Sequence, residues 1–380
     1  REVVLNTLEL LEKQGNSLNC VARLFPEDAL SEAEIADKEL SVGNSRGPLH
    51  GVPLTHKDMF YRKGKITACG SRICENYIPS VTATALVKLD SSGALDIGRL
   101  NMVEFAYGLT GHNEITGNVH NPLSPEHITG GSSSGPAAAV SGNLSYGSLG
   151  SDTGGSIRFP ASCCGIVGMK PTYGLVSRYG AMPLSFSLDH IGPLTRTVTD
   201  CALLTQIISG PDENDPTSLK HKNHNYLEKI DSGIKGVKIG VPHTIFLDKV
   251  DGEVLREMEK SLEVFMGLGA DILRISLPES FNISNEMANI ITAVEGSSAH
   301  RKWLKVRPED YGSQTRERLL SGSIISASDY LESLKLRKVV LQEFLQYVFD
   351  KVDILHVPVV PIPVPTIADS DIQANPGFVE

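Results

Sequence analysis

The sequence predicts an α/β fold in which a central mixed β-sheet is flanked by helices on both faces. Short apolar runs typical of buried strands alternate with segments whose apolar residues recur at helical spacing. The chain has 380 residues, 41% of them hydrophobic, so it is long enough to bury a substantial core. Strands that alternate with helices in this way favour a largely parallel or mixed sheet.

The expected elements follow in order along the chain. Residues 1–40 are expected to be helix-rich, with Val4 and Leu8 on one face and Ala29 and Ala33 on a later one. After these come a loop leading into a strand over 47–60, a helix and strand over 81–100, a strand over 236–242, a helix over 254–265, a strand over 270–278, helices over 285–304 and 327–349, and a last strand starting at residue 353.

Glycine, serine and threonine dominate residues 108–192, but short apolar segments interrupt them. A flexible linker would lack such segments, so we expect ordered loops on a scaffold. We interpret the chain as a single domain with a peripheral helical part over 1–46, a catalytic core over 47–200 and a helix-rich remainder over 201–380.

Composition excludes some classes of function. A net charge of −10 argues against direct nucleic-acid binding, because such surfaces are normally basic. The sequence has no apolar run of transmembrane length and no basic patch suited to anionic lipid, so we expect no membrane partner. It also shows no secretory signal, and we expect a cytoplasmic location.

The cysteines and histidines do not predict a metal or another cofactor. His221 and His224 lie in a polar loop with no carboxylate or cysteine at ligand spacing, which favours a solvated loop. The cysteines lack C-x-x-C spacing, which favours buried thiols in a reducing compartment over disulfides. They are Cys20, Cys69, Cys74, Cys163, Cys164 and Cys201.

The tripeptide Gly-Gly-Ser occurs twice, at 130–132 and 154–156. A phosphate cradle is one interpretation of the first copy, but neither a Walker Lys-Ser/Thr nor a G-x-G-x-x-G unit is present. A nucleophile elbow is another, because residues 131–135 match G-x-S-x-G, but no buried strand precedes them. The third interpretation joins Ser132 and Ser156 in one site with a lysine as base.

Lys57 is the candidate base because it lies in a mostly apolar predicted strand. Burial there would lower the pKa of its amine from about 10.4 towards 7. Strand alternation directs Asp58 to the opposite face, so Asp58 need not neutralise Lys57. Near Ser156, the glycines of SDTGGS would let the backbone approach a substrate, with N–H groups converging on a developing oxyanion.

Three stretches resemble the amidase signature family: GVPLTHKD around Lys57, GGSSSG at 130–135 and GSDTGGSIRFPASCCGIVGMKPTYGLVS at 150–177. The resemblance extends from about residue 47 to residue 366. It implies that Ser156 is the nucleophile, that Ser132 is a bridging serine preceded by a cis peptide bond, and that Lys57 is the general base. Ser156 would attack an amide carbonyl, and water would hydrolyse the resulting acyl-enzyme.

The resemblance also implies roles for neighbouring residues. It places the oxyanion hole at Thr153, Gly154, Gly155 and Ser156, and gives supporting roles to Gly131, Ser133, Asp152 and Arg158. Two plainer interpretations stay open: Ser133 as a helix cap and Asp152–Arg158 as a structural ion pair. In GHNEITGNVHNP and just before it, Tyr107, His112 and Asn113 are the candidates for the substrate pocket.

The resemblance leaves the substrate open, because family members hydrolyse very different amides. Some are subunits of glutamine-dependent tRNA amidotransferases, which release ammonia for a partner. The loop over 104–129 lacks the MGSSTENS-like stretch of those subunits, so we favour a stand-alone amidase for a small-molecule amide. A non-catalytic amide-binding protein is disfavoured because all three catalytic residue types are present, and a homodimer stays open.

Two features depart from the family pattern. Ser134 and Pro136 replace the glycine and small residue expected in GGSSGGS, which affects only the fine shape of that loop. The resemblance also implies a C-terminal segment containing a pattern such as G-x-P-a-x-x-x-P-x-G, which this sequence lacks. If the protein itself lacks that segment, part of the sheet and the pocket would be absent with it.

Overall fold

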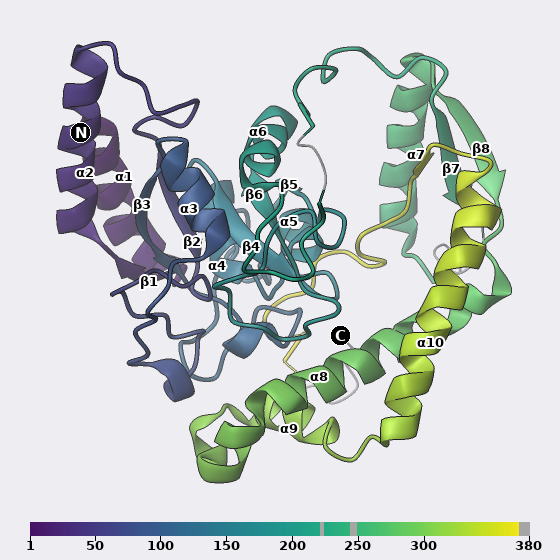
Figure 1. Cartoon of the computed structure of the whole chain (residues 1–380). Helices are drawn as coiled ribbons and strands as arrows, with labels where there is room; N and C mark the ends of the chain where they lie inside the picture. Colours follow the sequence, from purple (N-terminus) through teal and green to yellow (C-terminus); the bar gives the residue numbers. More distant parts are fainter. Residues whose placement is uncertain (221–223, 244–248, 372–380) are drawn as a thin grey trace. The chain divides into compact units, whose positions relative to one another are not determined.

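The computed structural model describes residues 1–220, 224–243 and 249–371. Two compact units make up the chain, and each is described by itself. The first contains Arg1–Glu228, Ala299–Leu320 and the segment from Thr366, and the second contains Lys229–Ser298 and Ser321–Pro365. Strands alternate with helices in both, which confirms the α/β prediction (Figure 1).

One sheet of the first unit carries Lys57 at the end of a strand. Its order is β1 (Val21–Leu24), β3 (Leu95–Leu100) and β2 (Pro53–Lys57), with β3 antiparallel to β1 and parallel to β2. Helix α3 (Thr84–Ser91) lies between the two parallel strands in the chain, as a parallel connection requires. Every residue of β2 is buried, and its last residue pairs with Leu100.

The N-terminal helices are α1 (Glu2–Leu10) and α2 (Pro26–Ser41). The apolar faces expected for residues 1–40 are indeed buried. Strand β1 is not among the elements predicted from the sequence, however. This strand has only four residues and owes its conformation to pairing with β3, so hydrophobic spacing gives little sign of it.

The second sheet of this unit lies within the glycine-rich region. Its order is β4 (Ser148–Asp152), β6 (His190–Thr195) and β5 (Val167–Gly168), all antiparallel. Helices α4 (Ser134–Ser141), α5 (Arg158–Cys163) and α6 (Val198–Ile208) complete this part. The ordered region expected over 108–192 therefore contains strands and helices as well as loops. All of β4 is buried and α4 is an almost wholly buried alanine helix, so neither has the two-faced pattern that identifies surface elements.

The second unit has a parallel sheet in the order β8 (Asp271–Ile275), β7 (Lys238–Pro242) and β9 (Ile354–Leu355). Helices α7 (Gly252–Gly267) and α10 (Ala327–Phe344) and the first part of α8 (Ser284–Val306) accompany it, close to their predicted positions (Figure 1). The later part of α8, from Ala299, and nearly all of α9 (Ser313–Ser321) lie in the first unit. Short helical turns cover Leu11–Gly15, Arg72–Cys74, Glu104–Ala106, Glu279–Ile283, Pro308–Asp310 and Leu345–Phe349.

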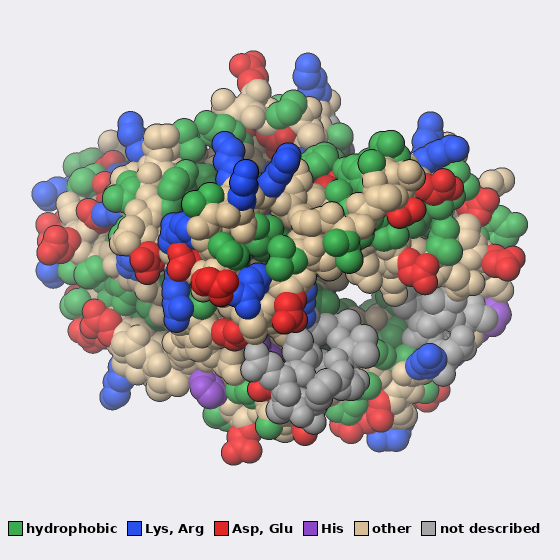
Figure 2. Space-filling model, turned by 90° about the horizontal axis from the view of Figure 1, so that it is seen from below, with side chains coloured by type: hydrophobic (Ala, Val, Ile, Leu, Met, Phe, Trp, Pro, Cys, Tyr) green, Lys and Arg blue, Asp and Glu red, His purple; other side chains and the backbone are tan. Residues whose placement is uncertain are grey.

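The cysteines lie in the interior, whereas charged side chains of both signs lie on the surface. All six cysteines are buried free thiols, as predicted. Acidic and basic side chains lie interspersed on the face shown in Figure 2. Within the described ranges, every helix is too short or too polar to cross a bilayer.

Candidate active site

Lys57 brings three separate segments together at its amine. Its side chain is fully buried at the end of β2, and its Nζ lies 2.7 Å from Ser132 Oγ and 2.8 Å from Ser151 Oγ. Burial lowers the pKa of Lys57 to about 7, although the charges of Asp152 and Asp189 oppose the shift. A large fraction of the amine is therefore neutral near pH 7 and can accept a proton.

Asp58 takes no part in this contact. Its carboxylate accepts a hydrogen bond from the Ala68 N–H at 3.1 Å, as the prediction that it faces away from Lys57 requires.

The segment that carries Ser132 has the backbone that the resemblance implies. The Gly131–Ser132 peptide bond is cis, and Ser132 and Ser133 are fully buried. A Cβ on Gly131 would lie 2.9 Å from Gly111 N, so only glycine fits there. The Ser133 N–H donates to the Ser156 carbonyl at 3.3 Å, which places the two Gly-Gly-Ser motifs in one site.

Ser133 occupies the N-cap position of α4 but does not cap it with its side chain. Its hydroxyl donates instead to the Ser151 carbonyl at 3.3 Å, which ties α4 to β4. The helix-cap interpretation of this side chain is therefore wrong, because the hydroxyl is used across the site.

Asp152 organises the turn that follows β4. It is fully buried and accepts hydrogen bonds from the N–H groups of Gly155, Ile157 and Arg158 at 2.9, 3.2 and 3.3 Å. The Arg158 guanidinium also donates to both carboxylate oxygens, from Nε to Oδ2 at 2.9 Å and from Nη2 to Oδ1 at 2.8 Å. Although burial opposes it, the hydrogen bonds and charge of Arg158 lower the pKa of Asp152. The ion pair expected from the sequence is thus present, and it also shapes the turn around Ser156.

This turn offers space for a substrate but not all of the predicted donors. Gly155 has a φ of +136°, a conformation that favours glycine, and a Cβ on Gly154 would meet no protein atom within 4 Å. The Gly155 N–H, however, points to Asp152 Oδ1. Its predicted role as an oxyanion donor is not supported by this geometry, whereas the assignments at Thr153, Gly154 and Ser156 stay predictions.

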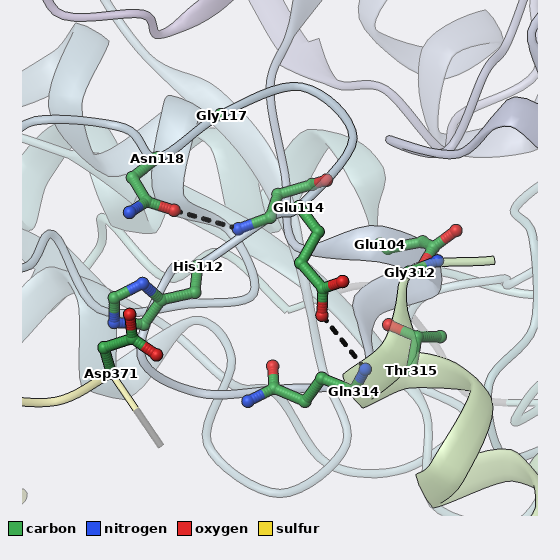
Figure 3. Close-up of a pocket in the computed structure, with 10 residues that line it drawn as sticks. Glu104, His112, Glu114, Gly117, Asn118, Gly312, Gln314, Thr315 and Asp371 are labelled. Carbon is green, nitrogen blue, oxygen red and sulfur yellow. Dashed lines mark hydrogen bonds between the residues drawn. The ribbon is translucent and has the colours of Figure 1, made fainter. Parts of the chain in front are cut away.

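The three candidate pocket residues have different surroundings. His112 and Asn113 line a cavity of about 280 Å³ together with polar groups that include Glu104 and Glu114 (Figure 3). Tyr107 instead contacts Arg318, whose Nη1 donates to the Tyr107 carbonyl at 2.7 Å.

Asn113 lines this cavity, but its side-chain amide forms hydrogen bonds with backbone groups. Its Nδ2 donates to the carbonyls of Gly70 and Met102 at 3.0 and 2.8 Å, and its Oδ1 accepts from Ile115 N and Thr116 N at 2.8 and 3.1 Å. The side-chain amide of Asn113 therefore shapes the loop, which argues against a direct role in binding substrate.

Sequence patterns missed two residues of the site. Ser151 touches the lysine amine, and Asp189 accepts a hydrogen bond from Thr153 Oγ1 at 2.6 Å. Neither belongs to a Gly-Gly-Ser motif. Ser151 lies in the stretch 150–177 that resembles the family, but its residue type does not indicate a contact with Lys57. The pairing of β4 with β6, which brings Asp189 beside Thr153, is not visible in the sequence.

In the described ranges, no group of three or more His, Cys, Asp or Glu side chains is placed to hold a metal ion. Of the two histidines weighed as ligands, His224 lies beside the ring of Tyr226, and His221 lies outside the described residues.

Comparison with known proteins agrees with this geometry. The Amidase family model matches residues 2–379. The A-type subunit of the glutamyl-tRNA(Gln) amidotransferase from Geobacter metallireducens is 38% identical over 380 residues, which cover 94% of this chain and 78% of the relative. The crystal structure of an amidase is 38% identical with a TM-score of 0.85, and covers 97% of this chain and 80% of the other. A second solved structure, from a vestigial protein complex related to the origins of an s-triazine catabolic enzyme, is 32% identical with a TM-score of 0.92 and the same coverage. The chain therefore belongs to the Amidase family, the amidase signature enzymes.

Proposed function

We propose that the chain hydrolyses a carboxylic amide through an acyl-enzyme on Ser156. The neutral Lys57 amine accepts the Ser132 proton, and Ser132 accepts the Ser156 proton as Ser156 Oγ attacks the carbonyl carbon. When the C–N bond breaks, the proton returns through Ser132 to the leaving nitrogen. Water then attacks the ester with the same residues as base, which yields a carboxylate and ammonia or an amine.

One observation carries this proposal: the buried Lys57 Nζ, with a pKa of about 7, lies 2.7 Å from Ser132 Oγ. A neutral amine has two N–H groups and one lone pair. It can therefore donate to the Ser151 hydroxyl while its lone pair receives the Ser132 proton. Ser151 would in this way orient the base.

For the substrate, we propose the side-chain amide of glutamine. The support comes from relatives named as the A-type subunits of glutamyl-tRNA(Gln) amidotransferases, which are 36–39% identical across at least 94% of this chain. In this proposal the chain has the role of those subunits and passes ammonia to a partner.

A stand-alone amidase is the second candidate. Two observations favour it: the loop over 104–129 lacks the MGSSTENS-like stretch, and a solved amidase is 38% identical to the chain. A catalytically silent amide-binding protein fits less well, because such a protein has no need of a buried lysine in contact with two hydroxyls.

The nucleophile is tested without knowing the substrate. A fluorophosphonate probe should label the purified chain at Ser156, as located by mass spectrometry. Ser156→Ala should abolish the labelling and Lys57→Ala should slow it strongly, whereas Ser91→Ala, on the exposed end of α3, should not change it. Equal labelling of the chain and of Ser156→Ala would overturn the assignment.

The rate of ammonia release from different amides then distinguishes the two candidate functions. L-Glutamine, short aliphatic amides and aryl amides are compared, with Ser156→Ala as control. Serine-dependent release that is greatest from L-glutamine supports the amidotransferase proposal. Release from simple amides with glutamine inert supports the stand-alone amidase instead.

A further inference from the structure

Asp189 is a second buried carboxylate beside the catalytic turn. It lies directly before β6, and the antiparallel register that pairs Asp152 with His190 brings it next to Thr153. Thr153 Oγ1 donates to Asp189 Oδ1 at 2.6 Å. The Asp189 side chain is 8% exposed, so this hydrogen bond is largely shielded from water.

The carboxylate is itself rigidly held. The Leu184 N–H donates to Asp189 Oδ2 at 2.9 Å, and the Ser185 N–H lies 3.0 Å from both oxygens. The Asp189 N–H in turn donates to the Ser185 carbonyl at 2.8 Å. The Asp189 carboxylate is therefore held by Leu184 and Ser185 independently of Thr153, and it offers the Thr153 hydroxyl an acceptor at a fixed position.

Two carboxylates thus hold the turn from opposite ends. Asp152 fixes its later part through the N–H groups of Gly155 and Ile157, and Asp189 fixes its first residue. We propose that Asp189 is a positioning residue for amide hydrolysis, which holds Thr153 so that the turn keeps the geometry needed around Ser156. This inference rests on the acyl-enzyme proposed above.

Asp189 also acts on the base through its charge. The Lys57 amine contacts the hydroxyls of Ser132 and Ser151, and the Cys69 side chain and the carboxylates of Asp152 and Asp189 act on its pKa electrostatically. Burial lowers the pKa of Lys57, and both carboxylates raise it. Loss of the Asp189 charge should therefore lower the pH at which Lys57 becomes neutral.

The groups around Asp189 are defined as well. Burial raises its pKa, whereas the hydrogen bonds from Thr153, Leu184 and Ser185 and the charge of Arg178 lower it. His190 and Asp215 line the same cavity of about 250 Å³ as Asp189.

Asp215 provides a matched control. It is 7% exposed and accepts two backbone N–H groups, those of Arg178 and Thr217, and the Thr217 hydroxyl at 2.6 Å. Its hydrogen-bond pattern of backbone N–H groups and one threonine hydroxyl resembles that of Asp189, although Asp215 also lies 3.8 Å from Arg178 Nε, and its threonine lies outside the catalytic turn. Asp215→Asn should lower stability much as Asp189→Asn does, without acting on Ser156.

The test is the rate of fluorophosphonate labelling at Ser156 as a function of pH. Thr153→Val should slow labelling about 10-fold with its pH midpoint unchanged, because only geometry is lost. Thr153→Ser should restore the rate. Asp189→Asn should both slow labelling and move the midpoint down by about one pH unit. Asp215→Asn should change neither the rate nor the midpoint.

Two results would overturn the proposal: Asp189→Asn indistinguishable from Asp215→Asn in rate and midpoint, or Thr153→Val labelled as fast as the unmodified chain. If the unmodified chain is not labelled at Ser156, the acyl-enzyme itself fails, and NMR titration of lysine side chains still decides the role of Asp189. The Lys57 signal, identified by its loss in Lys57→Met, should titrate at lower pH in Asp189→Asn but not in Asp215→Asn. An unchanged titration contradicts the effect on the base.

Discussion

Burial of the Lys57 amine should make the stability of the first unit depend on pH in a way that one substitution removes. Lys57→Met keeps a flexible chain of similar length at this fully buried position and deletes the charge. The variant also leaves the hydroxyls of Ser132 and Ser151 without the amine, a loss that does not change with pH. The pH-dependent part of the difference therefore reports on the amine alone.

The magnitude follows from the pKa of Lys57. Its fall from 10.5 to about 7 corresponds to on the order of 5 kcal/mol. Between these pH values the unfolded chain holds a proton that the folded chain has released, so the free energy of unfolding rises with pH. Below about pH 7 both states are protonated and the whole unfavourable term is present, whereas above 10.5 neither is protonated and the term is gone. Relative to Lys57→Met, the unmodified chain should gain about 1.4 kcal/mol per pH unit across this window.

Urea unfolding between about pH 7 and 9.5, inside this window, measures the difference. The single tryptophan, Trp303, lies in the first unit and stacks on Phe105, so its fluorescence reports on the unit that contains Lys57. Lys38→Met, on the exposed face of α2, serves as control and should show no such slope. If the difference in the free energy of unfolding between the chain and Lys57→Met does not change with pH, Lys57 is not neutral in the folded chain, and the proposed mechanism is contradicted.

Four further substitutions test other parts of the site and its support. Ser151→Ala, which removes one of the two hydroxyls at the amine, should lower the labelling rate of the nucleophile about 10-fold, the equivalent of losing one hydrogen bond to the neutral amine. Gly155→Ala should lower the free energy of unfolding by about 1–3 kcal/mol because of its φ of +136°, whereas Gly154→Ala should impair only labelling; urea unfolding distinguishes the two. Asp96→Asn should lower the free energy of unfolding by about 3–5 kcal/mol, because it leaves the fully buried Arg99 without the carboxylate that both of its Nη atoms contact, and a loss below about 1 kcal/mol would contradict this.

The sequence predicted the centre of the site because its chemistry lies in short motifs. Lys57 ends an apolar strand and each serine follows two glycines, so residue type, local conformation and role are visible together. Ser151 and Asp189 have no such local signal. Their contacts depend on the burial of β4 and on its register with β6, and both of those strands lie in a region whose small residues conceal the strand pattern.

The three candidate pocket residues lie on a loop, where residue type alone says less about what a side chain contacts. Polar residues on a loop are expected to face a ligand, but in a loop without regular structure the backbone also needs partners. Asn113 meets that need with all of its amide hydrogen bonds directed at the main chain. A sequence alone does not distinguish an amide that binds substrate from one that holds the loop.

The opposing influences on Lys57 suggest why the site keeps two carboxylates near a base that must be neutral. Burial favours the neutral amine, and alone it would also make the amine a poor proton acceptor. In the proposed mechanism the relay takes a proton from Ser156 and then returns it to the leaving nitrogen, and both transfers are fastest when the pKa of the base lies near the working pH. The charges of Asp152 and Asp189 oppose burial and hold the pKa of Lys57 at about 7. The residues that shape the turn around the nucleophile therefore also tune the base, so a substitution at either carboxylate should change geometry and proton transfer together.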